Sequence, residues 1–554
     1  MFNHRYARFL PQDLLAGVTG AVAGAPQAMG FAILAGVSPL YGLYTAFTAT
    51  VVGAIFSSSI LITVGPTNAL ALVVASAIGA LATEDQLATM FVLTFLTGVF
   101  FLLIGLLRLG NLTRFVSNAV MTGFITGAAV LIMLGQLDHL NGYEAETHSS
   151  IPLVRFWDWL IHLHQSIPTA TVIGVLSVAM IWLMHHTRLR RVATLVTMVV
   201  TGVLASALGW ADVPLVRDMS LIPSGLPGLM LPDLTLAPGL ASTAFAMAIL
   251  GAVQSAALIQ ATPNPDGTKV NISRDFAAMG TANVIGGFFQ GMPACASLSR
   301  TAVNVSAGGR TRMSNVYAGV FVGLILIVFG GLIELIPLAA LAGHLIVAAA
   351  SLIKPADLQM AWRVGRSGQV AMVTTLMATL VLPLEWSIYI GVVLSLLLYV
   401  YTSADNIQLT RMVAMGDGRF RRANLPETLP PNEAVILSVQ GHLFFAAVYR
   451  LEALLPDAST ADGTVVILRV RDNRYLGITG IQMLHDYAET LATTGGRLLL
   501  SGVSPEVYAQ LERTGALHLF GTGNVFVEND IVFDSTLRAY AESSKWLSST
   551  TPHA

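Results

Sequence analysis

The sequence contains little of what soluble enzymes and nucleic-acid-binding proteins are built from. Charged residues make up 11% of the 554 residues, and there is a single cysteine, Cys295. One cysteine excludes a disulfide bond within the chain. The formal net charge is −2 and no basic face is visible, so nucleic acid is not an expected partner. Neither a G-x-x-x-x-G-K-[ST] motif nor a nucleophile and base arrangement occurs, so we predict neither ATP-driven transport nor an enzyme.

Patterns of metal ligands are missing as well. The pairs His162/His164 and His185/His186 lie near the ends of apolar segments, without cysteines or carboxylates at the spacing of a metal site. We therefore predict no metal and no cofactor.

Apolar residues are abundant instead. They make up 54% of the chain, and the mean hydropathy of +0.70 is far above that of soluble globular proteins. Apolar stretches of spanning length recur between about residues 13 and 403, and in lipid such a stretch satisfies its backbone polar groups as a helix. The first stretch lacks a small-residue cleavage site, so we do not interpret it as a signal peptide. The sequence predicts an α-helical protein embedded in a lipid bilayer, with a transmembrane domain over residues 1–403.

We count fourteen membrane-spanning segments, several of them short or interrupted by Gly and Pro. Their approximate ranges are 13–36, 40–56, 66–82, 87–107, 113–135, 168–184, 192–209, 240–260, 276–290, 296–307, 314–331, 333–352, 368–384 and 386–403.

The charges of the connections orient these segments. Cytoplasmic loops carry an excess of Lys and Arg. With the N-terminus inside, the cytoplasmic side carries fourteen basic residues, whereas the other side carries Arg155 and Arg217. The fourteen are Arg5, Arg8, Arg108, Arg114, Arg188, Arg190, Arg191, Lys269, Arg274, Arg310, Arg312, Lys354, Arg363 and Arg366. We therefore expect a multi-pass protein of the inner or plasma membrane with both termini in the cytoplasm.

An internal repeat relates the two halves of the apolar region. "GAPQA" at 24–28 resembles "GAVQS" at 251–255, and Pro66 and Pro293 have the same offset of 227 residues. The repeats would cover about 12–209 and 240–403. Seven spans per repeat is an odd number, so the second copy must cross the bilayer inverted. Inverted repeats are typical of secondary transporters, whose substrate binds near the midplane between discontinuous helices.

The third and tenth segments are the expected discontinuous helices, because each is short and preceded by proline. A helix N-terminus favours an anion by about 0.3 to 1 kcal/mol, and by up to about 2 kcal/mol when partly buried. Removing water from an ion costs several kcal/mol, so a nearby guanidinium would supply much of the missing attraction. We predict this role for Arg300. Two other interpretations stay open, namely an arginine that extends to the membrane interface and an arginine that pairs with Glu334.

Three stretches resemble the sulfate permease family, also called SulP or solute carrier family 26. They are "DLLAGVTGAVAGAPQAMGFAILAGVSPLYGLY" (13–44), "VGPTNALALVVAS" (64–76) and "PACASLSRTAVNVSAGGRTR" (293–312). The resemblance implies a fold of seven plus seven inverted spans. It also implies a core domain of spans 1–4 and 8–11, a gate domain of spans 5–7 and 12–14, a cytoplasmic STAS domain and a homodimer.

The resemblance also implies the substrate-binding residues. Gln27 and Phe31 are one helical turn apart, on one face of the first segment, and would line the pocket. Ser299 takes the hydroxyl position and Arg300 the neighbouring basic position of the tenth segment. The remaining residues assigned to the site are Pro66, Thr67, Asn68, Gln254, Ala296, Ser297 and Leu298. Simpler roles stay open for two of these residues, because Phe31 would also suit an ordinary core and Ser299 a helix cap.

Gln254 departs from the family pattern. Many members carry an acid at this position of the eighth segment, which resembles a proton- or sodium-coupling residue. An amide does not take up a proton near neutral pH and attracts a cation less strongly than a carboxylate does. We therefore expect exchange or uncoupled anion movement.

The C-terminal part reads as a separate α/β domain. Residues 404–431 are charged and rich in turn formers, which indicates a linker, and 543–554 would be a tail. Between them, "AVILSV", "HLFFAAV", "VVILRV", "RLLLSGV" and "NVFV" read as strands, with helices near 478–494, 504–514 and 529–542. Residues 432–542 resemble a STAS domain, a docking place for a cytoplasmic regulator. Gly477 replaces the acid of phosphorylatable relatives and Thr479 keeps the hydroxyl, so a phosphorylation site and a helix cap both stay open.

The function predicted from these features is secondary transport of a small inorganic anion by elevator-type alternating access. Sulfate is the first expectation, and bicarbonate, chloride, nitrate and dicarboxylates are its competitors. The alternatives are an anion channel or uncoupled conductor, a nucleobase carrier on the same architecture, and a membrane anchor for a signalling STAS module.

Overall fold

The computed structural model describes residues 4–79, 81–110, 117–143, 152–185, 187, 193–219, 225–415, 419–471 and 473–550. The chain divides into two compact units, Met1–Ser395 and Leu396–Ala554. Four arginines used to orient the predicted spans, Arg114, Arg188, Arg190 and Arg191, lie outside the described residues.

Each of the fourteen predicted spans overlaps a helix that begins in the first unit. These helices are α1 (His4–Leu34), α2 (Pro39–Phe56), α3 (Asn68–Ile78), α4 (Thr83–Leu106), α5 (Asn118–Gly135), α8 (Pro168–His185), α9 (Ala193–Ala207), α11 (Ala237–Ala261), α12 (Ile272–Phe288), α13 (Leu298–Ser306), α14 (Met313–Ile333), α15 (Leu338–Ala350), α17 (Arg366–Val381) and α18 (Leu384–Asp405). The connecting helices are α6 (Leu137–Asn141), α7 (Pro152–Ile161), α10 (Val216–Met219) and α16 (Pro355–Arg363), with 3-10 turns η2 (Leu163–Gln165) and η4 (Leu234–Leu236).

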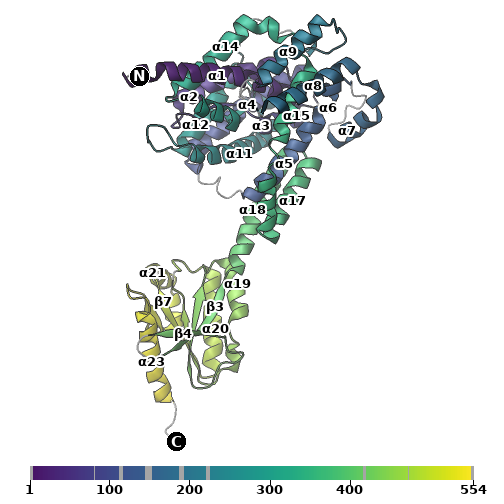
Figure 1. Cartoon of the computed structure of the whole chain (residues 1–554). Helices are drawn as coiled ribbons and strands as arrows, with labels where there is room; N and C mark the ends of the chain where they lie inside the picture. The colour runs from purple at the N-terminus through teal and green to yellow at the C-terminus, as the bar shows by residue number, and fades with distance from the viewer. Residues whose placement is uncertain are drawn as a thin grey trace. The chain divides into compact units, whose positions relative to one another are not determined.

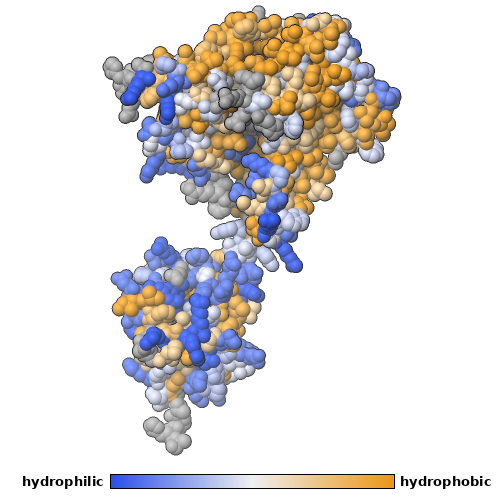
Figure 2. Space-filling view, in the orientation of Figure 1, coloured by the Kyte–Doolittle hydropathy of each residue, from blue (hydrophilic) through white to orange (hydrophobic). Residues whose placement is uncertain are grey.

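The lengths and surfaces of these helices fit a membrane protein. Among the described residues, eight helices are long and apolar enough to cross a bilayer, and α3, α8 and α9 are shorter apolar helices. Apolar residues cover much of the surface of this unit that Figure 2 shows. Side chains cap some of the helices, as at α2, where the Ser38 hydroxyl accepts a bond from the Leu40 N–H, and at α5, where the Ser117 hydroxyl accepts one from the Val120 N–H. The prediction of an α-helical membrane protein is confirmed.

The helices form two bundles, and Figure 1 labels most of their helices. A core bundle contains α1–α4 and α11–α14, and a gate bundle contains α5, α8, α9, α15 and α17. Helix α18 packs against α5 and α17 at Gly391 and is counted with the gate. In the core bundle α4 and α12 lie very close together. A Cβ at Gly98 or Gly280 would be 2.5 Å from a backbone nitrogen of the facing helix, so neither position has room for a side chain. Glycine at such a contact lets two helix backbones meet without a side chain between them.

The two halves of the first unit follow the predicted repeat, with an offset that changes along the chain. Helices α1 and α11 end at Leu34 and Ala261, 227 positions apart, which is the predicted offset. Helices α3 and α13 begin at Asn68 and Leu298, 230 positions apart. Three extra residues therefore precede the break in the second half. As a result, Pro66 ends a strand whereas Pro293 precedes one, and the two prolines are not equivalent.

A two-stranded sheet lies in the middle of the core bundle. Strand β1 (Val64–Pro66) pairs antiparallel with β2 (Ala294–Ala296), with Val64 opposite Ala296. All six residues are buried. So small a sheet is not stable by itself, and the surrounding helices must hold it. Because α3 follows β1 and α13 follows β2, the pairing brings the starts of these two helices together.

The second unit contains a six-stranded mixed sheet in the order β4-β3-β5-β6-β7-β8. Its strands are β3 (Gln408–Ala414), β4 (Phe420–Ala423), β5 (Ala434–Gln440), β6 (Val465–Arg469), β7 (Arg497–Val503) and β8 (Val525–Val527). Its helices are α19 (Phe445–Leu454), α20 (Ile478–Thr493), α21 (Pro505–Arg513), α22 (Ala516–Phe520) and α23 (Asp534–Thr550), with 3-10 turns η5 (Ala458–Thr460) and η6 (Thr522–Asn524). Strands β5 to β8 are parallel.

Alternating residues of the strands build two apolar layers in this unit. Val435, Leu437, Val466 and Leu468 belong to one layer, together with residues of α19–α22. Ile436, Ile467 and Leu499 belong to the other, together with Ala539 of α23. This follows from the two-residue period of a strand. In Figure 1, α23 accordingly lies on one side of the sheet, with α19 and α20 on the other.

Three features of this unit differ from the sequence prediction. Residues 404–431, predicted as a linker, contain β3 and β4, and β3 completes the sheet beside β5. "HLFFAAV" (442–448), predicted as a strand, leads into helix α19, because a short apolar run does not distinguish a strand from a buried helix. Most of the predicted tail 543–554 is the end of α23, and residues 551–554 lie outside the described part of the chain.

Candidate functional site

The starts of α3 and α13 form the centre of the candidate site. Their N-cap residues are Thr67 and Ser297, and neither side chain caps its helix. The first N–H groups of a helix have no partner within it, so each start offers free donors and a partial positive charge. The pairing of β1 with β2 holds the two starts together, and the Thr67 hydroxyl lies 3.5 Å from the Cys295 Sγ atom.

Gln27 and Ser299 meet beside these helix starts. The Ser299 hydroxyl donates a hydrogen bond of 3.0 Å to Oε1 of Gln27, across 272 residues of sequence. Ser299 is exposed, and its neighbour Leu298 is 58% exposed, whereas Gln27 and Asn68 are half-buried. Ser299 is not the helix cap, since Ser297 takes that position. An accessible face with a hydroxyl and an amide therefore borders both helix starts.

Another predicted residue, Gln254, lies close to this face. The Gln254 Oε1 atom lies 3.7 Å from the Cys295 Sγ, which brings the middle of α11 next to β2. The neighbouring Ser255 hydroxyl accepts a bond of 3.1 Å from the Ala296 N–H, so α11 also supports the strand. Phe31 is only 9% exposed and belongs to the large apolar cluster of the unit.

Arg300 lies behind the strand pair. Its side chain is 5% exposed, and its Nη2 donates a bond of 3.3 Å to the Pro66 carbonyl. Its Nε and Nη1 atoms have no hydrogen-bond partner, and among the described residues no carboxylate forms an ion pair with it. The structure therefore supports neither an arginine at the membrane interface nor a pair with Glu334.

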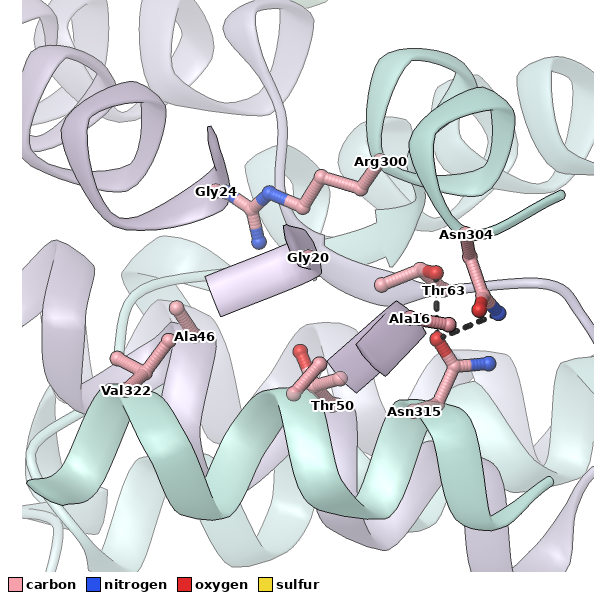
Figure 3. A pocket seen from close by; sticks show the side chains of 11 residues that line it. Ala16, Gly20, Gly24, Ala46, Thr50, Thr63, Arg300, Asn304, Asn315 and Val322 are labelled. Carbon is pink, nitrogen blue, oxygen red and sulfur yellow. Dashed lines mark hydrogen bonds between the residues drawn. The ribbon is translucent and has the colours of Figure 1, made fainter. Parts of the chain in front are cut away.

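The guanidinium faces a small cavity lined by both apolar and polar residues. Figure 3 shows Arg300 reaching from α13 toward Gly24, next to the space that Gly20, Ala46 and Thr50 border. The cavity has a volume of about 20 Å³, enough for about one water molecule. The fit on the other side is tight, since a Cβ at Gly65 would lie 2.1 Å from Nη1 of Arg300.

A polar network that the sequence analysis missed holds the segment before β1. The Thr63 hydroxyl donates to Oδ1 of Asn315 at 2.6 Å, and the Asn304 side-chain amide donates to the same atom at 3.2 Å. The Thr50 hydroxyl donates to the Val64 carbonyl at 2.7 Å. Figure 3 shows the two bonds to Asn315 beside the cavity. Two asparagines eleven positions apart in an apolar region were the available signal.

Asp275 anchors the same segment at its start. It is 2% exposed and accepts bonds from the hydroxyls of Ser57, Ser58 and Ser59. It also accepts bonds from the backbone N–H groups of Ser58 and Ser59, at 2.5 and 3.0 Å. Five donors satisfy this buried carboxylate, so it fixes the chain that leads into β1.

The arrangement suits a negatively charged ligand. Two helix starts, the Ser299 hydroxyl and the Gln27 and Gln254 amides lie near one another, and the buried Arg300 guanidinium lies behind β1. Together they offer donor groups and positive charge. None of the site residues is an acid, and no cluster of three or more His, Cys, Asp or Glu that could hold a metal occurs among the described residues.

Comparisons with known proteins identify related chains. Residues 10–375 match the sulfate permease family, and residues 426–529 match the STAS domain. A relative from Arabidopsis thaliana named probable sulfate transporter 4.2 is 29% identical over 552 residues, covering 95% of this chain and 81% of the relative.

Two solved structures share the fold. Murine Solute Carrier 26 family member A9, an anion transporter in the inward-facing state, gives a TM-score of 0.83 at 20% identity, covering 96% of this chain and 91% of that chain. The transmembrane domain of a cyanobacterium bicarbonate transporter, BicA, gives 0.59 at 23% identity, covering 70% of this chain and 97% of that chain. The predicted resemblance is confirmed.

Proposed function

The chain belongs to the sulfate permease family of anion transporters, and from this premise we propose that it is a secondary transporter moving inorganic anions by elevator-type alternating access. Sulfate is the first proposed substrate, because the Arabidopsis relative is named a sulfate transporter. Bicarbonate is the second proposed substrate, because BicA is described as a bicarbonate transporter. Chloride, nitrate and dicarboxylates complete the panel to be tested. The location we propose is the inner or plasma membrane, with both termini in the cytoplasm.

One observation supports this proposal above the others. Two helix starts converge on a face with Gln27 and Ser299, and the buried charge of Arg300 lies directly behind them. We assign Gln27, Thr67, Asn68, Gln254, Leu298 and Ser299 to contacts with the anion. We assign Pro66, Ala296 and Ser297 to the shape of the site, and Phe31 to its apolar wall. Arg300 attracts the anion through its charge, from behind β1.

The two bundles suggest how the site alternates. The helix starts, the strand pair and Arg300 all belong to the core bundle, which carries the complete site as one body. The gate bundle contributes α5 and α15 as the surface against which that body would slide. A site carried whole by one of two bundles fits an elevator better than a fixed pore. We further propose a homodimer and a STAS domain that binds a cytoplasmic regulator.

Uptake into proteoliposomes tests the function. The purified protein is reconstituted and supplied with labelled sulfate, bicarbonate, chloride, nitrate and a dicarboxylate, with and without the same anion inside. We expect saturable uptake of at least one anion, accelerated by internal anion. Flux that neither saturates nor accelerates would indicate a channel, and uptake of a neutral nucleobase alone would overturn the proposal.

The same preparation tests the coupling mode. Because Gln254 is an amide, we propose exchange or uncoupled movement. Uptake should then be unchanged by an inward proton or sodium gradient, measured at fixed membrane voltage. Strict dependence on a proton gradient, lost in Gln254→Ala, would contradict this assignment.

A further inference from the structure

Side-chain hydrogen bonds join the core helix α11 to the gate helix α18. The Thr243 hydroxyl on α11 donates to Oε2 of Glu385 on α18 at 3.0 Å. The Tyr389 hydroxyl, one turn further along α18, donates to the Ser242 carbonyl at 2.6 Å. The Ser242 and Tyr389 hydroxyls also lie 3.3 Å apart. Two neighbouring residues of the core thus meet two residues of the gate.

Burial, the charge of the carboxylate and apolar packing stabilise the Thr243–Glu385 contact. Thr243 is buried, and Glu385 and Tyr389 are half-buried. A hydrogen bond to a carboxylate is about twice as strong as one between neutral groups. Apolar packing accompanies the bonds, since Leu384 and Ile388 of α18 belong to the same buried cluster as residues of α11.

The contacts lie away from the anion site. Thr243 and Gln254 are eleven residues apart on the continuous helix α11, which corresponds to about 16 Å along its axis. Both α11 and α18 begin near the contacts, whereas the predicted cytoplasmic arginines Arg274 and Arg312 bind carbonyls at the end of α2. In the predicted orientation, the contacts therefore lie toward the outer side of the membrane.

The packing of α1 points to the same end. Met29 and Ile33, in the second half of α1, share an apolar cluster with Leu338 and Leu341 of the gate helix α15. In contrast, Leu10, Leu14 and Leu15, near the start of α1, are exposed. The core and gate bundles are thus joined mainly toward the end where α1 finishes.

We infer that the Thr243–Glu385 and Ser242–Tyr389 contacts form a latch that closes the transporter on the outer side. The latch must open whenever the core bundle presents the helix starts to that side. This inference rests on the proposed function, because the Thr243–Glu385 and Ser242–Tyr389 contacts must break only if the core bundle moves relative to the gate bundle. Glu385 acts on transport through the position of the bundles and touches none of the site residues.

Cross-linking tests the latch directly. The native chain has one cysteine, Cys295, and it is fully buried. A double variant Ser242→Cys with Tyr389→Cys therefore offers two reactive thiols at the contact, because Ser242 is exposed and Tyr389 is half-buried. A short bifunctional thiol reagent that is cleaved by reduction is added to proteoliposomes, and mass spectrometry confirms the bridge. We expect anion uptake to fall at least tenfold and to recover after reduction. The two single variants treated in the same way are the matched controls.

Two substitutions test the hydrogen bond without a reagent. Glu385→Ala removes the acceptor, whereas Glu385→Gln keeps an oxygen at the same place. A weaker latch favours the state open to the outside, so Glu385→Ala should bind external anion about three- to tenfold more tightly. Glu385→Gln should lie between this variant and the parent. A merely structural role would lower the amount of folded protein without improving external affinity.

The outcomes separate the latch from the proposed function. If the parent protein takes up no anion, the proposed function fails, and the latch, which rests on that function, fails with it. If the parent transports and the bridged double variant transports equally fast, the latch is wrong and the proposed function stands. External affinity unchanged in Glu385→Ala, in correctly folded protein, would likewise overturn the latch.

Discussion

Replacing Arg300 by methionine should make the anion-free protein more stable and its anion binding weaker. The structure supplies the reason for both effects. The guanidinium is buried, with Nε and Nη1 unpartnered and a single bond of 3.3 Å to the Pro66 carbonyl. An unsatisfied buried polar group costs about 1 to 3 kcal/mol, and more when it is charged. Methionine fills a similar volume without a charge, so Arg300→Met should raise the unfolding temperature by a few degrees.

The loss of affinity follows from the same charge. A guanidinium and an anion separated by about 6 to 8 Å attract each other by about 2 to 3 kcal/mol at an effective dielectric constant near 20. This corresponds to a roughly 30- to 100-fold weaker anion affinity in Arg300→Met. Arg300→Lys keeps the charge and should lose much less, although a lysine cannot reproduce the position of the guanidinium.

Thermal unfolding in detergent, with and without the transported anion, measures both effects. The parent should gain more stability from the anion than Arg300→Met does, because the stabilisation by a ligand at free concentration L, RT ln(1 + L/Kd), is larger when the ligand binds more tightly. A variant that unfolds at a lower temperature than the parent and keeps the full anion affinity would refute the reasoning. In that case Arg300 would serve packing alone.

Three further predictions concern other parts of the chain. Gly65→Ala should displace the Arg300 guanidinium, because a Cβ at position 65 would lie 2.1 Å from Nη1. Anion uptake should fall at least tenfold, whereas size-exclusion chromatography should still show folded protein. Asp275→Ala should lower the free energy of unfolding by about 3 kcal/mol or more, because five donors lose their acceptor. Asp275→Asn should lower it by less, because an acceptor oxygen remains. Unfolding temperatures of both variants equal to that of the parent would contradict this prediction. A fragment of residues 405–550 should unfold cooperatively when followed by circular dichroism. A fragment of residues 432–550 should not, because it lacks β3, which pairs with β5. Equally cooperative unfolding of the two fragments would show that 404–431 is a linker after all.

Much of the fold was predictable because it depends on local patterns. The length of an apolar stretch indicates a helix wherever the stretch lies. Each of the fourteen predicted segments overlaps a helix, and among the described residues eight helices are long and apolar enough to cross a bilayer. Gln27 and Ser299 were predicted as site residues from the resemblance to the family, and they do meet. The second unit was harder, because β3 and β4 are polar strands in a charged region and a short apolar run suits a strand or a helix equally well.

The buried features of the site were not predictable in this way. Thr50, Thr63, Asn304 and Asn315 read as scattered polar residues, because their partners lie far away in the sequence. Arg300 was expected beside the anion, and its place behind β1 depends on which face of α13 turns toward the α1 and α2 helices. A helical pattern alone does not distinguish these faces in a segment surrounded by protein on most sides.

By itself, then, the sequence determined that the chain crosses a membrane many times, that its halves are related, and that a positive charge lies next to a helix break. Only the tertiary structure decided that β1 and β2 pair, that α3 and α13 start side by side, and that Thr243 meets Glu385. The physical reason is the separation along the chain of the residues that interact. Hydrophobic length and helical period act between neighbours along the chain, whereas strands 230 positions apart become partners only through the packing of the whole bundle.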